Sequence, residues 1–259
     1  MAELEASSQA SPKNEKPESF AELLKSLVFA VVLATLVHTV AYKPFHIPSG
    51  SMKPNLLIGD FLFVSKFTYG YSHFSLPFSP PLFSGRIFAS NKPKIGEVFV
   101  FRGPHDPNTD YIKRVVGLPG DRVQMREGIL YINDKPCTLE QIEDFEDIDE
   151  DSGLPVKVPQ YIETLPNGVK HRIIKYERFG EGRLDNTQVY EVPQGHYFGM
   201  GDNRDRSGDS RILRGIGYIP EEYIIGRAEI LFFSTSARWW EIWKWPTGAR
   251  YTRFLNLIK

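Results

Sequence analysis

The apolar residues of this chain form one long run near the N-terminus and a series of short runs after it. Residues 26–42 read SLVFAVVLATLVHTVAY and carry no Asp, Glu, Lys or Arg. As a helix this segment is about 25 Å long, near the lower limit for crossing a bilayer. We expect a single transmembrane helix over 26–42, preceded by a cytoplasmic tail over 1–25. A cleaved signal peptide and a buried core helix are the alternatives, and the excess of Glu over Lys in residues 1–25 argues against the first.

The short runs that follow have the length and composition of β-strands. They are about five residues long, rich in aromatic and β-branched residues, and separated by turns such as Leu118-Pro119-Gly120-Asp121. The runs lie at 60–64, 97–101, 121–125, 129–132, 197–200 and 229–233. We therefore predict a mostly β fold, an antiparallel sheet or barrel-like catalytic domain over 43–259, with a β-rich inserted subdomain at about 137–190. Within the insert, the acidic block 140–151 is expected to be a solvated helix or loop, because Ile142, Phe145 and Ile148 recur every three residues.

Charge and cysteine content exclude several classes of function. Lys+Arg and Asp+Glu nearly cancel, giving a formal net charge of -1, so no global field draws the protein to nucleic acid. The single cysteine, Cys137, excludes an internal disulfide and a cysteine-based zinc site. The six histidines show neither His-x-His nor His-x-x-x-His spacing. We therefore expect no metal, no cofactor and no nucleic-acid partner.

All four tryptophans fall in one basic window near the C-terminus. Trp239, Trp240, Trp243 and Trp245 have Arg238, Lys244 and Arg250 as neighbours. Indole rings with basic neighbours favour the headgroup layer of a bilayer. Ordinary core packing is the alternative interpretation. On the first interpretation these residues contact lipid.

A serine turn and a lysine among bulky residues are the candidates for chemistry. A serine hydroxyl needs a base to become a nucleophile, and a lysine can serve only when neutral. Lowering a lysine pKa by about three units requires roughly 4 kcal/mol of differential stabilisation, which burial can supply. Tyr111, Ile112, Val115 and Val116 surround Lys113 in the sequence and could exclude water from it. On its own, however, this pattern is more typical of a surface lysine on a strand.

Four longer segments change that balance. Residues 45–56 (FHIPSGSMKPNL), 59–70 (GDFLFVSKFTYG), 110–121 (DYIKRVVGLPGD) and 201–211 (GDNRDRSGDSR), with Gly226-Arg227-Ala228 after the last, occur in this order. They resemble the conserved boxes of bacterial type I signal peptidases, the serine proteases with a Ser/Lys dyad of family S26. The resemblance runs from the apolar segment to about residue 228.

The resemblance implies a role for each matching residue. Ser51 would be the nucleophile and Lys113 the general base, and the Ser49 hydroxyl would join the Ser51 backbone N–H as the oxyanion hole. Ser207 would orient the Lys113 amine through a hydrogen bond, with Asp209 and Arg211 as a supporting ion pair. The positions matching the family's shallow substrate pockets are Phe45, Ile47, Met52, Leu56, Asp110, Tyr111 and Ile112.

The implied function is a membrane-bound endopeptidase that removes signal peptides from secreted preproteins after Ala-x-Ala. The chain would be a single-pass protein of the bacterial plasma (inner) membrane, with its catalytic domain on the extracytoplasmic (periplasmic) side. Two departures stand out: residues 212–220 are slightly longer than the usual aromatic-glycine run, and the chain offers one apolar segment and one cysteine where some members have two anchors and a disulfide.

Three alternatives are open at this level. A self-cleaving repressor-type protease uses the same Ser/Lys chemistry but needs a helix-turn-helix where this chain has its apolar segment. A membrane-tethered β domain that binds proteins without catalysis is the second. A calcium loop at Asn203, Asp205, Ser207 and Asp209 is the third, and Arg214 at the position of the bidentate glutamate argues against it.

Overall fold

The computed structural model describes residues 20–76, 79–89, 91–149, 152–237 and 240–258, and divides the chain into two units, 1–37 and 38–259. Helix α1 covers Phe20–Val40, so it begins earlier than expected and includes the charged Glu22 and Lys25. Across the part of the chain described, no helix has both the length and the apolar character that a membrane crossing requires. The expected transmembrane helix over 26–42 is therefore not supported.

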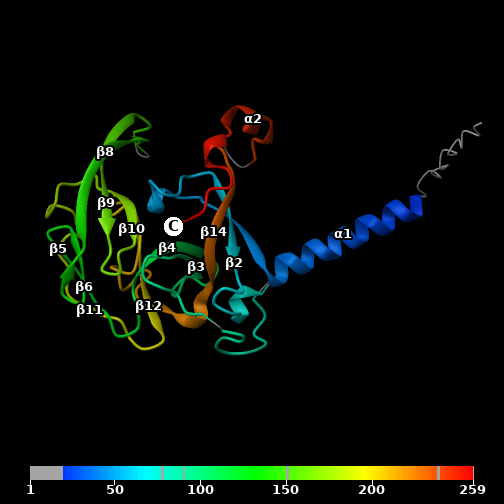
Figure 1. The fold of residues 1–259 in the computed structure, drawn as a ribbon, viewed down its shortest axis with the longest axis horizontal. Helices are drawn as coiled ribbons and strands as arrows, with labels where there is room; N and C mark the ends of the chain where they lie inside the picture. The colour runs from blue at the N-terminus through cyan, green and yellow to red at the C-terminus, as the bar shows by residue number, and fades with distance from the viewer. Residues whose placement is uncertain (1–19, 77–78, 90, 150–151, 238–239, 259) are drawn as a thin grey trace, which may run out of the picture. The chain divides into compact units, whose positions relative to one another are not determined.

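The main sheet of the second unit has seven antiparallel strands in the order β1-β2-β14-β3-β4-β12-β13. Its central strands pair residues far apart in the sequence, as in β14 against β2 and β3 (Figure 1). The strands are β1 (Tyr42–His46), β2 (Asp60–Ser65), β3 (Val98–Arg102), β4 (Asp110–Gly117), β12 (His196–Met200), β13 (Ile219–Pro220) and β14 (Ile224–Ser234).

Two smaller antiparallel sheets complete the β structure. One has the order β11-β5-β6-β7, and the other, built from the insert, has the order β10-β9-β8. Their strands are β5 (Arg122–Arg126), β6 (Ile129–Ile132), β7 (Lys135–Pro136), β8 (Thr138–Ile148), β9 (Pro155–Thr164), β10 (Lys170–Ile174) and β11 (Tyr190–Glu191). The mostly β, antiparallel fold class is confirmed. The expectation of a helix or loop at 140–151 is wrong, because most of that block lies in β8.

Alternating apolar residues of these strands build the core. In β2, Leu62 and Val64 are fully buried, and they pack with Val98 and Val100 of β3 in a cluster beneath the serine turn. A second cluster lies between β5, β6 and β12, and a third contains aromatic residues of β3 and β12. Because strand side chains alternate between faces, a run of five residues places two or three of them in a core. The serine turn and β4 are thus both supported by packed apolar residues.

The C-terminal segment contains short helical turns and the tryptophans. Trp245 is half-buried and packs against Phe233 and Phe61, with ring centroids 4.9 and 6.0 Å away from its own. Trp240 and Trp243 are exposed, and Trp239 lies outside the described residues. The short helices within the described residues are η1 (Gly50–Met52), η2 (His73–Ser75), η3 (Glu221–Tyr223), η4 (Ile242–Lys244), α2 (Trp245–Gly248) and η5 (Tyr251–Arg253).

Candidate active site

The serine turn links the edge strand β1 to a buried one-turn helix. After β1, Ile47 exchanges backbone hydrogen bonds with Asp60 and Gly59, which fixes the chain where it leaves the strand. Helix η1 then carries Ser51, and the next residue, Met52, is fully buried in the core. The apolar side chain thus anchors the turn while the neighbouring hydroxyl reaches a cavity.

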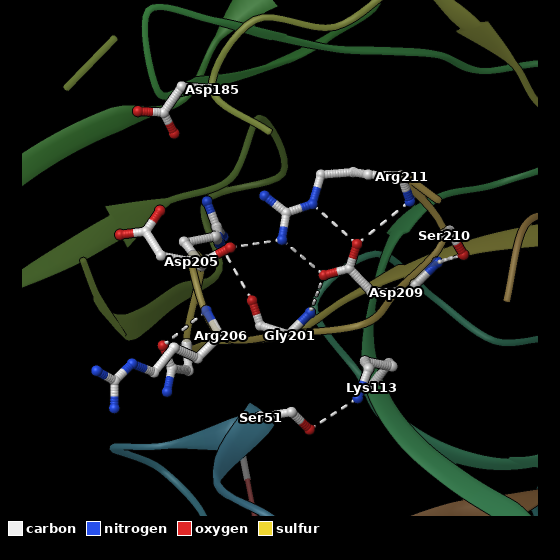
Figure 2. Close-up of polar contacts among 12 residues, drawn as sticks. Ser51, Lys113, Asp185, Gly201, Asp205, Arg206, Asp209, Ser210 and Arg211 are labelled. Atoms are coloured by element: carbon white, nitrogen blue, oxygen red, sulfur yellow. Dashed lines mark hydrogen bonds and ion pairs between the residues drawn. The ribbon is translucent and has the colours of Figure 1, made fainter. Parts of the chain in front are cut away.

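Strand β4 brings Lys113 to this hydroxyl. The Lys113 Nζ lies 2.8 Å from Ser51 Oγ (Figure 2). It donates a second hydrogen bond of 3.0 Å to the Ile112 carbonyl. Lys113 is only 3 % exposed, and its strand β4 lies between β3 and β12 in the sheet. Lys113 is therefore a buried residue, and its amine is hydrogen-bonded to the Ser51 hydroxyl.

Burial changes the acid–base character of this amine. Desolvation lowers the pKa of Lys113 to about 8, although the carboxylates of Asp209 and Asp202 act in the opposite direction. At pH 7 a group with a pKa of about 8 is neutral in about one molecule in ten. A normal lysine is neutral in fewer than one in a thousand. The amine can therefore accept a proton at neutral pH.

A buried ion pair lies behind Lys113. Arg211 donates from Nε and Nη2 to the two oxygens of Asp209, each at 2.8 Å, and the Gly201 N–H donates to Asp209 at 3.1 Å (Figure 2). Burial disfavours the carboxylate, but Arg211 and these hydrogen bonds hold the pKa of Asp209 below its usual value. The segment 201–211 is thus held in its conformation by the buried Asp209–Arg211 ion pair.

Ser207 does not make the hydrogen bond expected of it. Its hydroxyl is buried, and among the described residues it has no hydrogen-bond partner, Lys113 included. It lies instead against Gly201, where an added Cβ would be 2.2 Å from Ser207 Oγ and 2.5 Å from the Ser51 carbonyl oxygen. Glycine is thus required at 201 because the backbone passes so close to both serines.

Asn203 fixes the serine turn, a role that the sequence did not predict. Its backbone N–H donates to the Ser51 carbonyl and its side-chain Nδ2 to the Gly50 carbonyl, both at 3.1 Å. Both groups are buried. The polar run 201–211 thus holds the backbone of the nucleophile candidate as well as facing its base.

Beneath Asn203 lies a buried ionic network that the sequence also did not predict. Arg114 binds both oxygens of Asp202 at 2.8 Å, and Arg204 binds both oxygens of Glu163 at 2.6 and 2.5 Å. His171 lies between the two pairs, with Nε2 3.2 Å from Glu163. Paired charges of this kind tolerate burial only when their geometry is this complete. Glu163 and His171 come from β9 and β10, so the insert supports the site.

The predicted pocket residues divide into two groups. Ile47, Met52, Leu56 and Ile112 are buried in one core cluster, and Phe45 packs against it. Asp110 instead forms ion pairs with Lys43 and Arg102, at 2.5 and 2.8 Å, which joins β4 to β1 and β3. Asp110 therefore holds neighbouring strands of the pocket wall together.

A cavity of about 260 Å³ opens at the serine–lysine pair. It brings together three segments: the serine turn, β4 and the 201–211 run. Its lining residues are Ser49, Gly50, Ser51, Tyr111, Lys113, Arg206 and Gly208. The Ser49 and Ser51 residues expected to form an oxyanion hole thus face the same space. Such a site can hold one small side chain next to a hydroxyl with an adjacent amine base.

Comparison with known proteins identifies the family of this chain. The chain is 43% identical to a signal peptidase I of Rickettsia massiliae over 222 residues, which is 83% of this chain and 80% of that one. It is 41% identical to a signal peptidase I of Rickettsia canadensis over 239 residues, 90% of this chain and 87% of the other. Among solved structures, a signal peptidase I from Enterococcus faecalis V583 matches with 24% identity and a TM-score of 0.30, covering 53% of this chain and 97% of that one. The family model described as signal peptidase, peptidase S26, matches residues 20–233, and the chain therefore belongs to this family.

Proposed function

We propose that this chain is a serine endopeptidase that cleaves signal peptides from secretory preproteins. The observation that carries the proposal is the buried pair of Lys113 Nζ and Ser51 Oγ, 2.8 Å apart. Family membership supports it, because the relatives are themselves signal peptidases. No cofactor enters the reaction proposed below.

In this reaction Ser51 is the nucleophile and Lys113 the base. The Ser51 hydroxyl gives its proton to the neutral Lys113 amine while Oγ attacks the scissile carbonyl carbon. The resulting ammonium then protonates the leaving nitrogen, and the C–N bond breaks to release the mature chain. The same amine, neutral again, then takes a proton from water as the water oxygen attacks the acyl carbon. The ammonium returns that proton to Ser51 Oγ as the acyl–oxygen bond breaks. The lowered pKa of Lys113 allows the amine to accept and give back a proton near neutral pH.

The oxyanion of this reaction would be bound by the Ser49 hydroxyl and the Ser51 backbone N–H. Both residues line the cavity. The two hydrogen bonds from Asn203 to the Gly50 and Ser51 carbonyls keep the turn in one conformation before substrate arrives. Donors fixed in advance stabilise developing charge without reorganisation, and removing one such donor costs about 10²–10³ in kcat.

Small residues before the cut fit the space that is available. Ile47, Met52, Leu56 and Ile112 are almost entirely buried, so side chains of the core already fill the region beside the serine turn. A substrate with Ala-x-Ala adds little volume there, whereas a bulky residue would have to displace packed side chains. We propose that this shallow wall sets the preference for alanine.

Cleavage of a purified preprotein tests the function. When the preprotein has alanine immediately before the cut, the full-length enzyme is expected to release the mature chain. Replacing that alanine by phenylalanine is expected to reduce kcat/KM by at least about a hundredfold, because the wall cannot accept the ring. Product mass identifies the bond that is cut. Equal cleavage of both substrates, or binding without cleavage, would contradict the proposal and favour a non-enzymatic binding domain.

We also propose that the protein works at a bacterial inner membrane, with its catalytic unit on the extracytoplasmic side. The support is apolar exposure: Trp240 and Trp243 are 51% and 70% exposed, and α1 carries large exposed apolar side chains on more than one face. Those of α1 are Phe20, Leu23, Leu24, Leu27, Val28, Phe29, Val31, Val32 and Leu33.

Flotation with phospholipid vesicles tests the attachment. The full-length protein is expected to float with vesicles, and a variant with Leu27, Phe29 and Leu33 changed to Asp is expected to stay at the bottom of the gradient, because charged side chains oppose insertion into lipid. The Trp240→Ala, Trp243→Ala variant is expected to lose part of its binding. Equal flotation of all three proteins would contradict lipid contact at these positions.

A further inference from the structure

The acidic insert reaches the rim of the candidate active site. The Asp147 carboxylate, near the end of β8, accepts hydrogen bonds from Lys53 Nζ at 3.0 Å on each oxygen and from the Tyr176 hydroxyl at 2.8 Å. Lys53 comes directly after helix η1, and both ionic side chains are nearly buried. The end of β8 is therefore attached to the segment that carries Ser51.

The insert also holds Arg206 in place. Asp149 accepts a hydrogen bond from Arg206 Nη2 at 2.6 Å, and the guanidinium carbon lies 3.9 Å from the centre of the Tyr176 ring. Stacking on one face and an ion pair on one edge define the orientation of a planar guanidinium. The Arg206 side chain is still one-third exposed and lines the cavity beside Ser51. A permanent positive charge is thus fixed at the cavity wall.

The position of Arg206 assigns it to one side of the cut. On the proposed function, residues before the cut lie along β4 and the serine turn, which supply Tyr111, Lys113 and the three residues of the turn to the cavity. The other two lining residues, Arg206 and Gly208, belong to the 201–211 run. In the view of Figure 2, the Arg206 and Lys113 side chains lie on different sides of Ser51. The substrate residues that follow the cut would therefore lie along the other wall of the cavity, next to Arg206.

We propose that Arg206, oriented by Asp149 and Tyr176 of the insert, is a specificity determinant for the first two residues of the mature chain, favouring an acidic side chain and opposing a basic one. This inference rests on the proposed function. A guanidinium has five N–H donors in a planar fork, so it can bind Asp149 and also donate to a substrate carboxylate. A lysine at the same place would meet a fixed like charge. Because the arginine is partly exposed, the effect is modest, about fivefold in kcat/KM for a single charge.

Competition between matched preproteins tests the proposal. Three substrates that differ only in carrying Asp, Asn or Lys at the first residue after the cut, and a second set varied at the next residue, are cleaved by the full-length protein. The expected order of kcat/KM in at least one set is Asp, Asn, Lys, with steps of about fivefold that shrink at high salt. Arg206→Gln is expected to bring the Asp/Lys ratio close to one, and Arg206→Glu to invert it.

A ratio measured on one preparation is independent of how much of the enzyme is active, so imperfect folding of a variant does not imitate the result. Arg183→Gln removes the same charge from an exposed position of the insert that does not line the cavity, and it is expected to keep the wild-type ratio. An unchanged Asp/Lys ratio in Arg206→Gln, or equal cleavage of all substrates by the wild type, overturns the inference while leaving the endopeptidase function intact. If the wild type cleaves none of them, the proposed function fails and the inference fails with it.

Discussion

Replacing Ser51 with alanine is expected to lower kcat by about 10⁴-fold or more, because it removes the attacking oxygen and, among the described residues, the only hydroxyl that is hydrogen-bonded to the Lys113 amine. The Lys113 Nζ is hydrogen-bonded to Ser51 Oγ and to a backbone carbonyl. Of these two groups only the Ser51 hydroxyl can give up a proton and act as a nucleophile. Initial rates of preprotein cleavage, followed by gel and by mass spectrometry of the product, measure the loss.

The same variant is expected to fold normally. Ser51 lines a cavity, and its removal deletes one oxygen without opening the core cluster that holds Met52. A change in the free energy of unfolding below about 1 kcal/mol is expected from denaturant titration. Ser84→Ala, at an exposed serine, is the matched control and is expected to keep wild-type activity. Turnover by Ser51→Ala near the wild-type rate would exclude Ser51 as the nucleophile.

Strand positions were predictable from the sequence because they depend on local pattern. The runs at 60–64, 97–101, 121–125, 129–132 and 197–200 all coincide with strands to within a residue at each end. Together these runs, each about five residues long, are rich in aromatic or β-branched residues, a composition that is typical of strands. The pairing of β14 with β2 and β3, by contrast, joins segments more than a hundred residues apart and has no local signature.

The error at β8 has a specific cause. Ile142 and Phe145 are three residues apart, which would place them on opposite faces of a regular strand and suggested a helix. The register of β8 against β9 shifts between these two residues, where Ile142 pairs with Gln160 and Phe145 with Val158. A bulge adds one residue to one strand, so both apolar side chains can lie on the same half-buried face. A three-residue period in an otherwise polar stretch is therefore compatible with a bulged strand.

The site was predictable where its residues lie in contiguous motifs and not where they come from the insert. Ser51, Lys113 and the Asp209–Arg211 pair stand in segments that the resemblance covers. Glu163 and His171 do not. Because charged residues are almost always exposed, nothing in the sequence indicated that Glu163 is buried between Arg204 and His171. The hydrogen bond of Ser207 was expected by resemblance alone, and the structure places that hydroxyl against Gly201 instead.

Replacing Lys113 with methionine is expected to lower kcat by at least about 10³-fold, because Met has a similar length and no basic nitrogen. Stability is expected to be unchanged or higher, since an apolar chain replaces an amine whose burial opposes its charge. Lys135→Met, at an exposed lysine of β7, is the matched control and is expected to retain activity.

The pH profile links this loss to the amine itself. The neutral form of Lys113 is the active form, and burial lowers its pKa to about 8. As pH falls below that value the amine becomes charged, so the wild-type kcat/KM is expected to decrease about tenfold per pH unit on the acid side and to level off above about 8. The residual activity of Lys113→Met is expected to lack this limb, because no group remains that must lose the same proton. Buffers of constant ionic strength between pH 6 and 10 separate the two curves. An acid limb that survives unchanged in Lys113→Met would assign the base to another residue and remove the amine from the mechanism.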